Sequence, residues 1–210
     1  MDNRIGVSNT QLNQSQVDIL YDLLKRFEII AQKSGLRYSI ACGTALGAVL
    51  RGGLIPWDND ADLFALHDDF TTKLPIIVRN AAGHFTIEKY TRWSDGRGWY
   101  KIYHPRAPYP NIDLYLLEPY AKENVWRPSD AEIRRRAQMY LTNDQIAFHE
   151  RIGFGPLSLP IFSNPVAFFD RYYGPKWRFA NSAAQADGKE RILTTRDAFL
   201  DFRPSLPSVF

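Results

Sequence analysis

The sequence contains little of several residue types that mark particular classes of protein. A single cysteine, Cys42, among 210 residues excludes an internal disulfide and any zinc site built from several cysteines. Residues 1–10 have no apolar core, so they do not resemble a secretory signal peptide. No stretch approaches the roughly 18 apolar residues of a membrane-spanning helix. We therefore expect a soluble protein of a reducing compartment, located in the cytoplasm.

Charge and composition narrow the class further. Hydrophobic residues make up 45% of the chain, which is enough for a sizeable core. The net charge of +3 permits phosphate-bearing ligands without requiring them. No basic stripe is interleaved with aromatic residues, so we expect no nucleic-acid partner. The three arginines at 134–136 are typical of a solvated helix face, or alternatively of a surface that rests on an anionic membrane.

The length predicts one domain over residues 1–210, and nothing in the sequence indicates the oligomeric state. Within it we expect a core over about 12–120, a helical lobe over about 121–180 and a loosely packed tail over 181–210. Apolar periodicity and turn residues predict the elements. In order, these are a helix over 9–33 capped by Asn9 or Ser15, a strand over 36–41, a helix over 44–50, strands over 61–66, 84–90, 99–103 and 112–117 with a helix over 68–82 after the first, a helix over 129–140, a loop over 153–160 and a helix over 165–173.

Three acids at alternate positions precede one of these strands. Asp58, Asp60 and Asp62 lead into an apolar run over residues 63–66. Because alternate residues of a strand point to the same face, Asp60 and Asp62 should project together, with Asp58 beside them. Carboxylates that crowd one face repel each other unless a cation lies among them, and hard oxygen ligands suit Mg²⁺ or Mn²⁺.

A further acid, Asp113, lies in the apolar strand Ile112–Leu117. A lone carboxylate in a buried strand is costly unless it is paired or ligated. Two acids on one strand and a third on a neighbouring strand, after a Gly-Thr turn at Gly43-Thr44, form the general pattern of the nucleotidyltransferase fold. The alternative is structural: Asp58 and Asp62 are solvated turn acids, and Asp113 bonds a backbone amide. We favour the metal site because the acids and the Gly-Thr turn occur together.

The block GTALGAVLRGGLIPWDNDADL at residues 43–63 resembles the signature of the LicD/fukutin family of phosphotransferases. Strands around 99–103 and 112–114 resemble the family's basic strand and third-acid strand, and the segments starting at 154 and 172 resemble its late element. The chain departs from the family pattern at Asn59 and at residues 51–53. It also lacks the cysteines that bind zinc in some animal relatives.

The resemblance implies an α+β fold, in which a nucleotidyltransferase-like mixed β-sheet is flanked by helices and followed by a helical C-terminal part. It implies a metal-dependent transfer of a phospho-alcohol, such as phosphocholine or ribitol phosphate. The donor would be CDP-activated, and the acceptor would be a hydroxyl of a cell-surface or protein-linked glycan. A nucleotidyltransferase that adds NMP from an NTP to a small molecule or macromolecule remains the alternative, because both share the fold and the acids.

The resemblance also assigns roles to the acids. Asp60 and Asp62 would hold two Mg²⁺ or Mn²⁺ ions, as in other two-metal sites. Asp113 would assist as a ligand and could also act as the general base for the acceptor hydroxyl. Asp58 would order the ligands or waters around the ions.

Four further residues are assigned to the donor. Gly43 and Thr44 would present backbone amides and a hydroxyl to a phosphate at a helix start. Lys101 is the best single cation for the donor phosphates, or alternatively an edge-strand lysine with its ammonium in water. Arg51 would either contact phosphate or pair with Asp58.

Overall fold

A computed structural model describes residues 12–91, 98–130, 138–175, 177–179 and 204–208 of the 210-residue chain. Helix α1 (Gln14–Ser34) opens this part of the chain. It begins at a capping box, in which the Asn13 side chain accepts from the Gln16 backbone and the Gln16 side chain accepts from the Asn13 backbone. The observed cap is thus Asn13 and not the predicted Ser15, which lies inside the first turn of α1, while Asn9 lies outside the described residues. Gly35 ends the helix in the left-handed conformation (φ 66°), as Ser34-Gly35 predicts.

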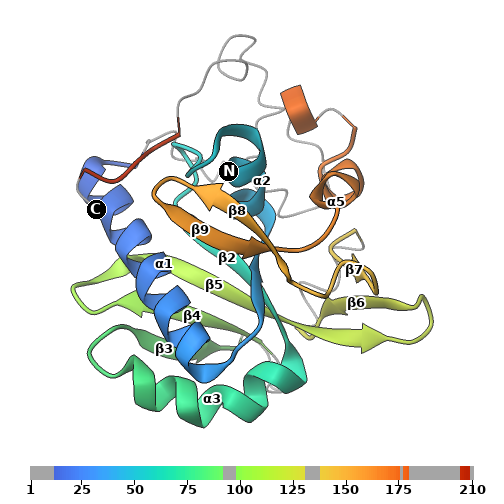
Figure 1. Ribbon diagram of the computed structural model, residues 1–210, viewed down its shortest axis with the longest axis horizontal. Helices are drawn as coiled ribbons and strands as arrows, with labels where there is room; N and C mark the ends of the chain where they lie inside the picture. The colour runs from blue at the N-terminus through green and yellow to red at the C-terminus, as the bar shows by residue number, and fades with distance from the viewer. Residues whose placement is uncertain (1–11, 92–97, 131–137, 176, 180–203, 209–210) are drawn as a thin grey trace, which may run out of the picture.

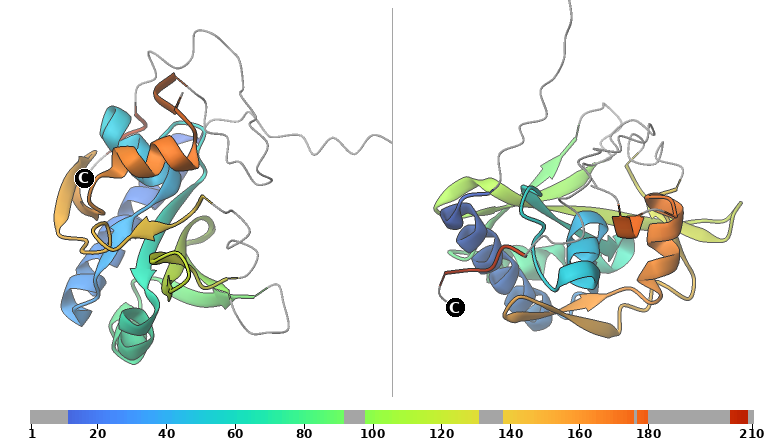
Figure 2. Two further views of the ribbon diagram at one scale, coloured as in Figure 1. Left: turned by 90° about the vertical axis from the view of Figure 1, so that its right-hand side faces the viewer. Right: turned by 90° about the horizontal axis from the view of Figure 1, so that it is seen from above.

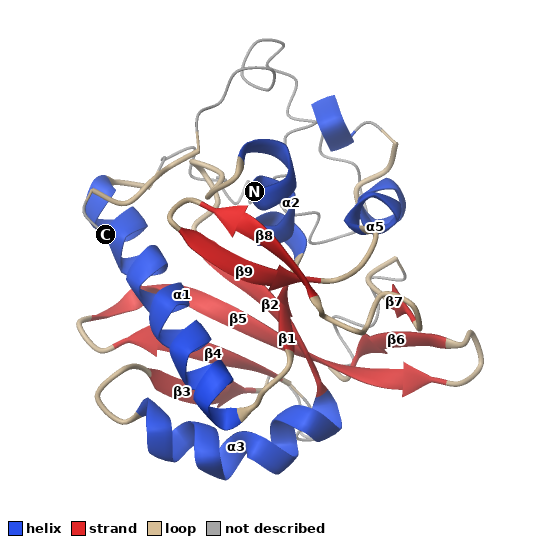
Figure 3. Ribbon diagram, in the orientation of Figure 1, coloured by secondary structure: helices blue, strands red, loops and turns tan. Residues whose placement is uncertain are grey.

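The described residues form one nine-stranded mixed sheet, shown in red in Figure 3. Its main path runs β3-β4-β5-β2-β1-β9-β8, and β6 and β7 extend it from β5. Strands β2 and β5 are parallel, as are β1 and β9, whereas the other pairs are antiparallel. The strands are β1 (Tyr38–Ile40), β2 (Asp60–Leu66), β3 (Thr86–Tyr90), β4 (Trp99–His104), β5 (Ala107–Tyr120), β6 (Val125–Pro128), β7 (Leu141–Thr142), β8 (Glu150–Phe154) and β9 (Leu157–Ile161).

Helices pack on both faces of this sheet (Figure 1). Helix α1 crosses β4 and β5 and packs against α3 (His67–Ala81), whose Phe70 contacts Tyr100 of β4. On the other face lie α2 (Cys42–Arg51) and α5 (Pro165–Tyr172), and Phe168 of α5 contacts Phe64 of β2. A 3-10 turn, η1 (Trp177–Phe179), follows α5. The α+β class, with a central mixed sheet flanked by helices, is therefore confirmed.

The segment after residue 120 differs from the predicted helical lobe over about 121–180. Its described part contains four strands, and helix is confined there to α5 and η1. The predicted loop over 153–160 is instead the β8–β9 hairpin, which joins the main sheet through β1 and lies against α2 (Figure 2). Glycine and proline suggested a loop, but Gly155 (φ 56°) sits at the tight turn and Pro160 lies inside β9. The predicted helix over 129–140 lies largely outside the described residues, as do the arginines at 134–136.

Residues 204–208 return to the start of the chain and bind to it. Ser205 forms an antiparallel bridge with Leu54, donating to its carbonyl at 3.0 Å. The hydroxyl of Tyr21 on α1 donates to the carbonyl of Ser205 (3.0 Å) and accepts from the N–H of Leu54 (3.3 Å). Ser208 donates to Asp18 from both its backbone and its hydroxyl. This segment therefore ties the loop after α2 to α1, more firmly than the loose packing predicted for the tail over 181–210, whose other residues lie outside the described ranges. No helix in the described ranges is both long enough and apolar enough to cross a bilayer.

Candidate functional site

Strand register places three predicted site residues side by side. Asp62 of β2 is the register partner of Asp113 on β5, and Asp113 is the partner of Lys101 on β4. Partners in register point to the same face of a sheet. The two carboxylates and the ammonium thus form a row across three adjacent strands, although Asp62 and Asp113 lie far apart in the sequence.

The remaining two acids join the same cluster. Asp60 is two residues before Asp62 on β2, and its register partner Asn111 is two residues before Asp113, so all four share one face. Asp58 shares a side-chain hydrogen bond with Asp60. The structure therefore brings Asp58, Asp60, Asp62 and Asp113 together at the start of β2.

Burial and mutual repulsion raise the pKa values of these acids. Burial, followed by repulsion from Asp113, raises the pKa of Asp60 to about 6, and Lys101 acts in the opposite direction. Burial and then the charge of Asp60 hold the pKa of Asp58 well above its usual range. The pKa of Asp62 is also well above its usual range, through burial and then repulsion from its neighbours. The cluster is thus a place where added positive charge would be stabilising.

The start of α2 is hydrogen-bonded to one of the acids, Asp62. The N–H of Gly43 donates to Oδ2 of Asp62 (3.3 Å), and the Thr44 hydroxyl accepts from the Asp62 N–H (2.8 Å). Preceding them, Cys42 has a positive φ of 39°, a conformation that costs energy for a residue with a Cβ. In this structure, then, Gly43 and Thr44 contact Asp62, and their predicted contact with a donor phosphate stays a prediction.

Asp113 is enclosed by polar groups. Its Oδ1 atom accepts from Lys101 Nζ at 2.6 Å and from Asn111 Nδ2 at 2.7 Å, and its Oδ2 atom lies 3.5 Å from the Tyr115 hydroxyl. Only 8% of the Asp113 side chain is exposed. The structural alternative, in which Asp113 bonds a backbone amide, is not what these contacts show.

Lys101 does not lie on an edge strand. Strand β4 has β3 on one side and β5 on the other, and β3 forms the edge. The alternative of an ammonium extended into water is therefore wrong, since Nζ bonds Asp113. Arg51, at the end of α2, is exposed and donates to the carbonyl of Leu50. Its predicted role at a phosphate stays untested.

Sequence reasoning missed two residues of the site, Asn111 and Tyr115. Both flank Asp113 at a spacing of two, so alternation along the strand could have found them. A third, Tyr173, follows α5, and burial raises the pKa of its hydroxyl well above the usual range, with smaller contributions from Cys42, Tyr172, Asp62 and Asp58 in that order. No sequence pattern links Tyr173 to the acids, because their proximity depends on how α5 packs on the sheet.

The chemistry of the cluster fits a hard divalent cation. Its donors are carboxylate oxygens, the ligands that Mg²⁺ and Mn²⁺ prefer, and the raised pKa values reflect charge that a cation would neutralise. Within the described ranges, however, no three His, Cys, Asp or Glu side chains are gathered as tightly as a formed metal site requires. The Lys101 ammonium pairs with Asp113 within this cluster.

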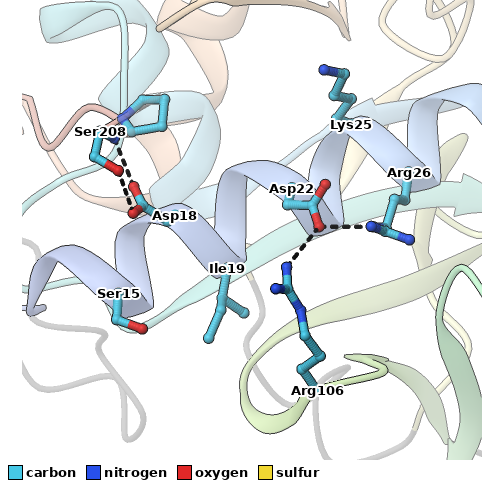
Figure 4. A pocket seen from close by; sticks show the side chains of 9 residues that line it. Ser15, Asp18, Ile19, Asp22, Lys25, Arg26, Arg106 and Ser208 are labelled. Carbon is cyan, nitrogen blue, oxygen red and sulfur yellow. Dashed lines mark hydrogen bonds and ion pairs between the residues drawn. The ribbon is translucent and has the colours of Figure 1, made fainter. Parts of the chain in front are cut away.

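A separate groove of about 680 Å³ runs along α1 and contains none of the predicted site residues (Figure 4). Asp22 lies at its centre and pairs with Arg26 (2.8 Å), Arg106 (3.8 Å) and the buried His104 (2.8 Å). His104 is three positions after Lys101 on β4 and so points to the opposite face of the sheet. This groove is thus separated from the acidic cluster by the sheet, and its Asp22 carboxylate already pairs with Arg26 and Arg106.

A mixed sheet that carries paired acids on two neighbouring strands, with a Gly-Thr helix start beside them, defines a nucleotidyltransferase-like domain. The family described as "LicD/FKTN/FKRP, nucleotidyltransferase domain" matches residues 35–164, which is more than half of the chain. The chain therefore belongs to this family. The match includes the residues of the cluster described above.

Two curated relatives match shorter segments. The lipopolysaccharide cholinephosphotransferase LicD of Haemophilus influenzae is 26% identical over 70 residues, which cover 33% of this chain and 26% of the relative. An uncharacterised protein of Rickettsia typhi is 35% identical over 63 residues, which cover 30% of this chain and 20% of the relative. The matched segments thus span about a quarter or less of the length of these relatives.

Among solved structures, the terminal uridylyl transferase 4 of Trypanosoma brucei with bound GTP is similar to part of the chain. The likeness covers 50% of this chain and 32% of the other, with 16% sequence identity and a TM-score of 0.29. The assignment of the fold therefore comes from the topology of the sheet and the family match.

Proposed function

We propose that this chain is a metal-dependent phosphotransferase that moves a phospho-alcohol from a CDP-activated donor to a hydroxyl of a cell-surface or protein-linked glycan. Phosphocholine and ribitol phosphate are the first candidates for the transferred group. The family match and the similarity to a cholinephosphotransferase support this class of reaction. The observation that carries the proposal is the row formed by Asp62, Asp113 and Lys101 across three strands, with Asp60 beside it.

In this proposal the acids hold the cations and position the acceptor. Asp60 and Asp62 would bind Mg²⁺ or Mn²⁺ with Asp113, while Asp58 orders the ligands around them. Bound metal would supply charge stabilisation to the diphosphate and lower the pKa of the attacking hydroxyl. Asp113 would accept the proton of the acceptor hydroxyl, since a carboxylate in hydrogen-bond reach is a suitable general base.

Other residues of the chain would hold the donor. The Lys101 ammonium lies on the acidic face and would pair with the donor phosphates, whose charge exceeds that of one carboxylate. Gly43 and Thr44 lie at the start of α2, where backbone N–H groups favour anions. Arg51, at the other end of α2, is a more distant candidate for phosphate contact.

The products of turnover test the proposal. The purified chain would be incubated with Mg²⁺ and CDP-choline, CDP-ribitol or labelled NTPs, with water or a glycan as acceptor. Transfer of a phospho-alcohol releases CMP, whereas transfer of a nucleotidyl group releases pyrophosphate. We expect metal-dependent release of CMP from a CDP-alcohol, and its loss in the variant Asp62→Asn.

Each other outcome has a definite meaning. Release of pyrophosphate from an NTP would support the alternative, a nucleotidyltransferase that adds NMP. Turnover that persists in EDTA would contradict metal dependence. The absence of turnover with every donor, in protein that binds Mn²⁺ and is folded, would contradict both transferase assignments.

A further inference from the structure

The contacts of Asp113 raise a question about how a metal could reach it. Its Oδ1 atom already accepts two short hydrogen bonds, from Lys101 Nζ (2.6 Å) and from Asn111 Nδ2 (2.7 Å). A carboxylate oxygen has two lone-pair sites, so both sites of Oδ1 are used. A cation can therefore bind this oxygen only if one donor leaves.

Lys101 is held firmly in this position. It lies on an interior strand, and only 20% of its side chain is exposed. Its Nζ atom also lies 5.7 Å from the ring centre of Tyr90 and 5.9 Å from that of Trp99, within the range of cation–π attraction. The ammonium is therefore stabilised by a carboxylate on one side and by aromatic rings on the other.

We propose that Lys101 is the resident counter-cation of Asp113, and that it makes metal binding ordered. In the free protein one divalent cation would bind at Asp60 and Asp62, while the Lys101 ammonium stays paired with the Asp113 carboxylate. A nucleoside diphosphate then draws the ammonium to its phosphates, which frees Oδ1 of Asp113 for a second cation. This inference rests on the proposed function, because it assumes that the cluster binds metal and a diphosphate.

The position of the ammonium beside the acids favours this order over simultaneous loading. Asp62 and Lys101 are both register neighbours of Asp113, so an ion placed between the two acids would lie next to the ammonium. Like charges at such short range repel strongly where water is scarce. A diphosphate removes the conflict, because its negative charge compensates both the ammonium and the added ion.

Counting bound Mn²⁺ tests the inference without any assay of activity. Mn²⁺ would be titrated into the protein with and without CDP, and bound ions would be measured by electron paramagnetic resonance against a protein-free CDP control. We expect about one ion per chain without CDP and about two with it. Two ions without CDP, or one ion under both conditions, would overturn the inference.

Substitutions of Lys101 provide a second test of the inference. Lys101→Met keeps the aliphatic stem but removes the charge, so a second ion should bind without CDP, at least about tenfold more tightly than in the wild type. Lys101→Arg keeps the charge and should bind the same number of Mn²⁺ ions as the wild type, with and without CDP. Lys89→Met is the matched control, because Lys89 pairs with Tyr100 and so lies on the other face of the sheet; it should leave Mn²⁺ binding unchanged.

The outcomes separate this inference from the proposed function. If the wild type binds Mn²⁺ but Lys101→Met binds it no differently, the ordered mechanism is wrong while the metal site remains. If the wild type binds no Mn²⁺ with or without CDP, the proposed metal-dependent function fails as well. The wild-type count decides the question even if Lys101→Met does not fold.

Discussion

A Cβ atom placed on Gly43 would lie 2.0 Å from Oδ2 of Asp58, which is closer than any two such atoms can approach. The start of α2 and the acid loop before β2 are thus in direct contact at Gly43, where any larger residue would have to displace the Asp58 side chain. The glycine that was predicted to approach a phosphate is, in this structure, the one that makes room for a carboxylate.

The variant Gly43→Ala should therefore displace Asp58 and disturb Asp60, its hydrogen-bond partner. We expect Mn²⁺ affinity to fall at least about tenfold, and Tm to fall by roughly 2–5 °C, since the clash is with a movable side chain. Isothermal titration with Mn²⁺ and thermal unfolding measure the two effects. Gly153→Ala is the control, because nothing lies within 4 Å of a Cβ at that position. Unchanged Mn²⁺ affinity in Gly43→Ala would contradict a role for this loop in the metal site.

Asp62→Asn should separate function from stability. The variant loses a predicted metal ligand, so metal-dependent turnover should fall by roughly 10³-fold or more. It also removes one of several repelling carboxylates, and asparagine can still accept from Gly43, so Tm in EDTA should stay constant or rise.

The same substitution at a paired acid should have the opposite effect on stability. Burial acts to raise the pKa of Asp69, but hydrogen bonds from Lys73 and from the Arg37 N–H outweigh burial and lower this pKa. Asp69→Asn should therefore lower Tm by a few degrees. A large fall in the Tm of Asp62→Asn in EDTA, similar to that of Asp69→Asn, would show that Asp62 is stabilising and not strained.

The acid cluster also predicts how stability depends on pH. An acid whose pKa is raised on folding binds more protons in the folded chain, so the free energy of unfolding decreases as the pH rises. For Asp60 the free energy of unfolding begins to decrease near the ordinary pKa of about 4. The decrease is complete once the pH is above the folded pKa of about 6. We expect Tm in EDTA to fall by on the order of 5 °C between pH 4.5 and pH 7.5.

Acids with lowered pKa values, such as Asp22 and Asp69, stabilise the folded chain while they are ionised. Their contribution to the free energy of unfolding is lost only as the pH falls through these pKa values, so it does not change over this range. Mg²⁺ should reduce the decrease at neutral pH by neutralising the cluster. Asp60→Asn should flatten the profile in EDTA. A Tm that rises steadily from pH 4.5 to 7.5 without metal would contradict the prediction.

Tyr21 links three segments, and its removal should loosen all of them. Its buried hydroxyl bonds both Leu54 and Ser205, and burial raises the pKa of this hydroxyl to about 12. Tyr21→Phe leaves the Leu54 N–H and the Ser205 carbonyl without this partner, so we expect a loss of about 1–3 kcal/mol in the free energy of unfolding. Urea unfolding measures the loss, and hydrogen exchange at the Leu54 amide should accelerate.

Tyr120→Phe is a suitable control for that experiment. Its ring, which lies 4.9 Å from the Arg127 guanidinium carbon, is kept in the variant, so stability should change little. Equal stability of Tyr21→Phe and the wild type would show that residues 204–208 do not hold the loop after α2 in solution.

Local patterns in the sequence predicted most of the elements before residue 120. The apolar periodicity of α1, the left-handed glycine that ends it and the alternation around β2 are properties of short segments, which depend on backbone sterics and burial alone. The prediction of a loop over residues 153–160, which rested on Gly155 and Pro160, was wrong. These residues form a hairpin because β1 provides a strand to pair with, and this partner lies more than 100 positions earlier in the chain.

The sequence alone determined the family, the face on which Asp60 and Asp62 project, and the identity of Asp113 as a buried acid. Only the tertiary structure decided that Asp62, Asp113 and Lys101 lie in register, that Lys101 binds Asp113, and that Gly43 packs on Asp58. The alternation of side chains between the two faces is a local property of every strand. Register between strands is set by how the whole sheet buries its side chains, and so it cannot be deduced from one segment at a time.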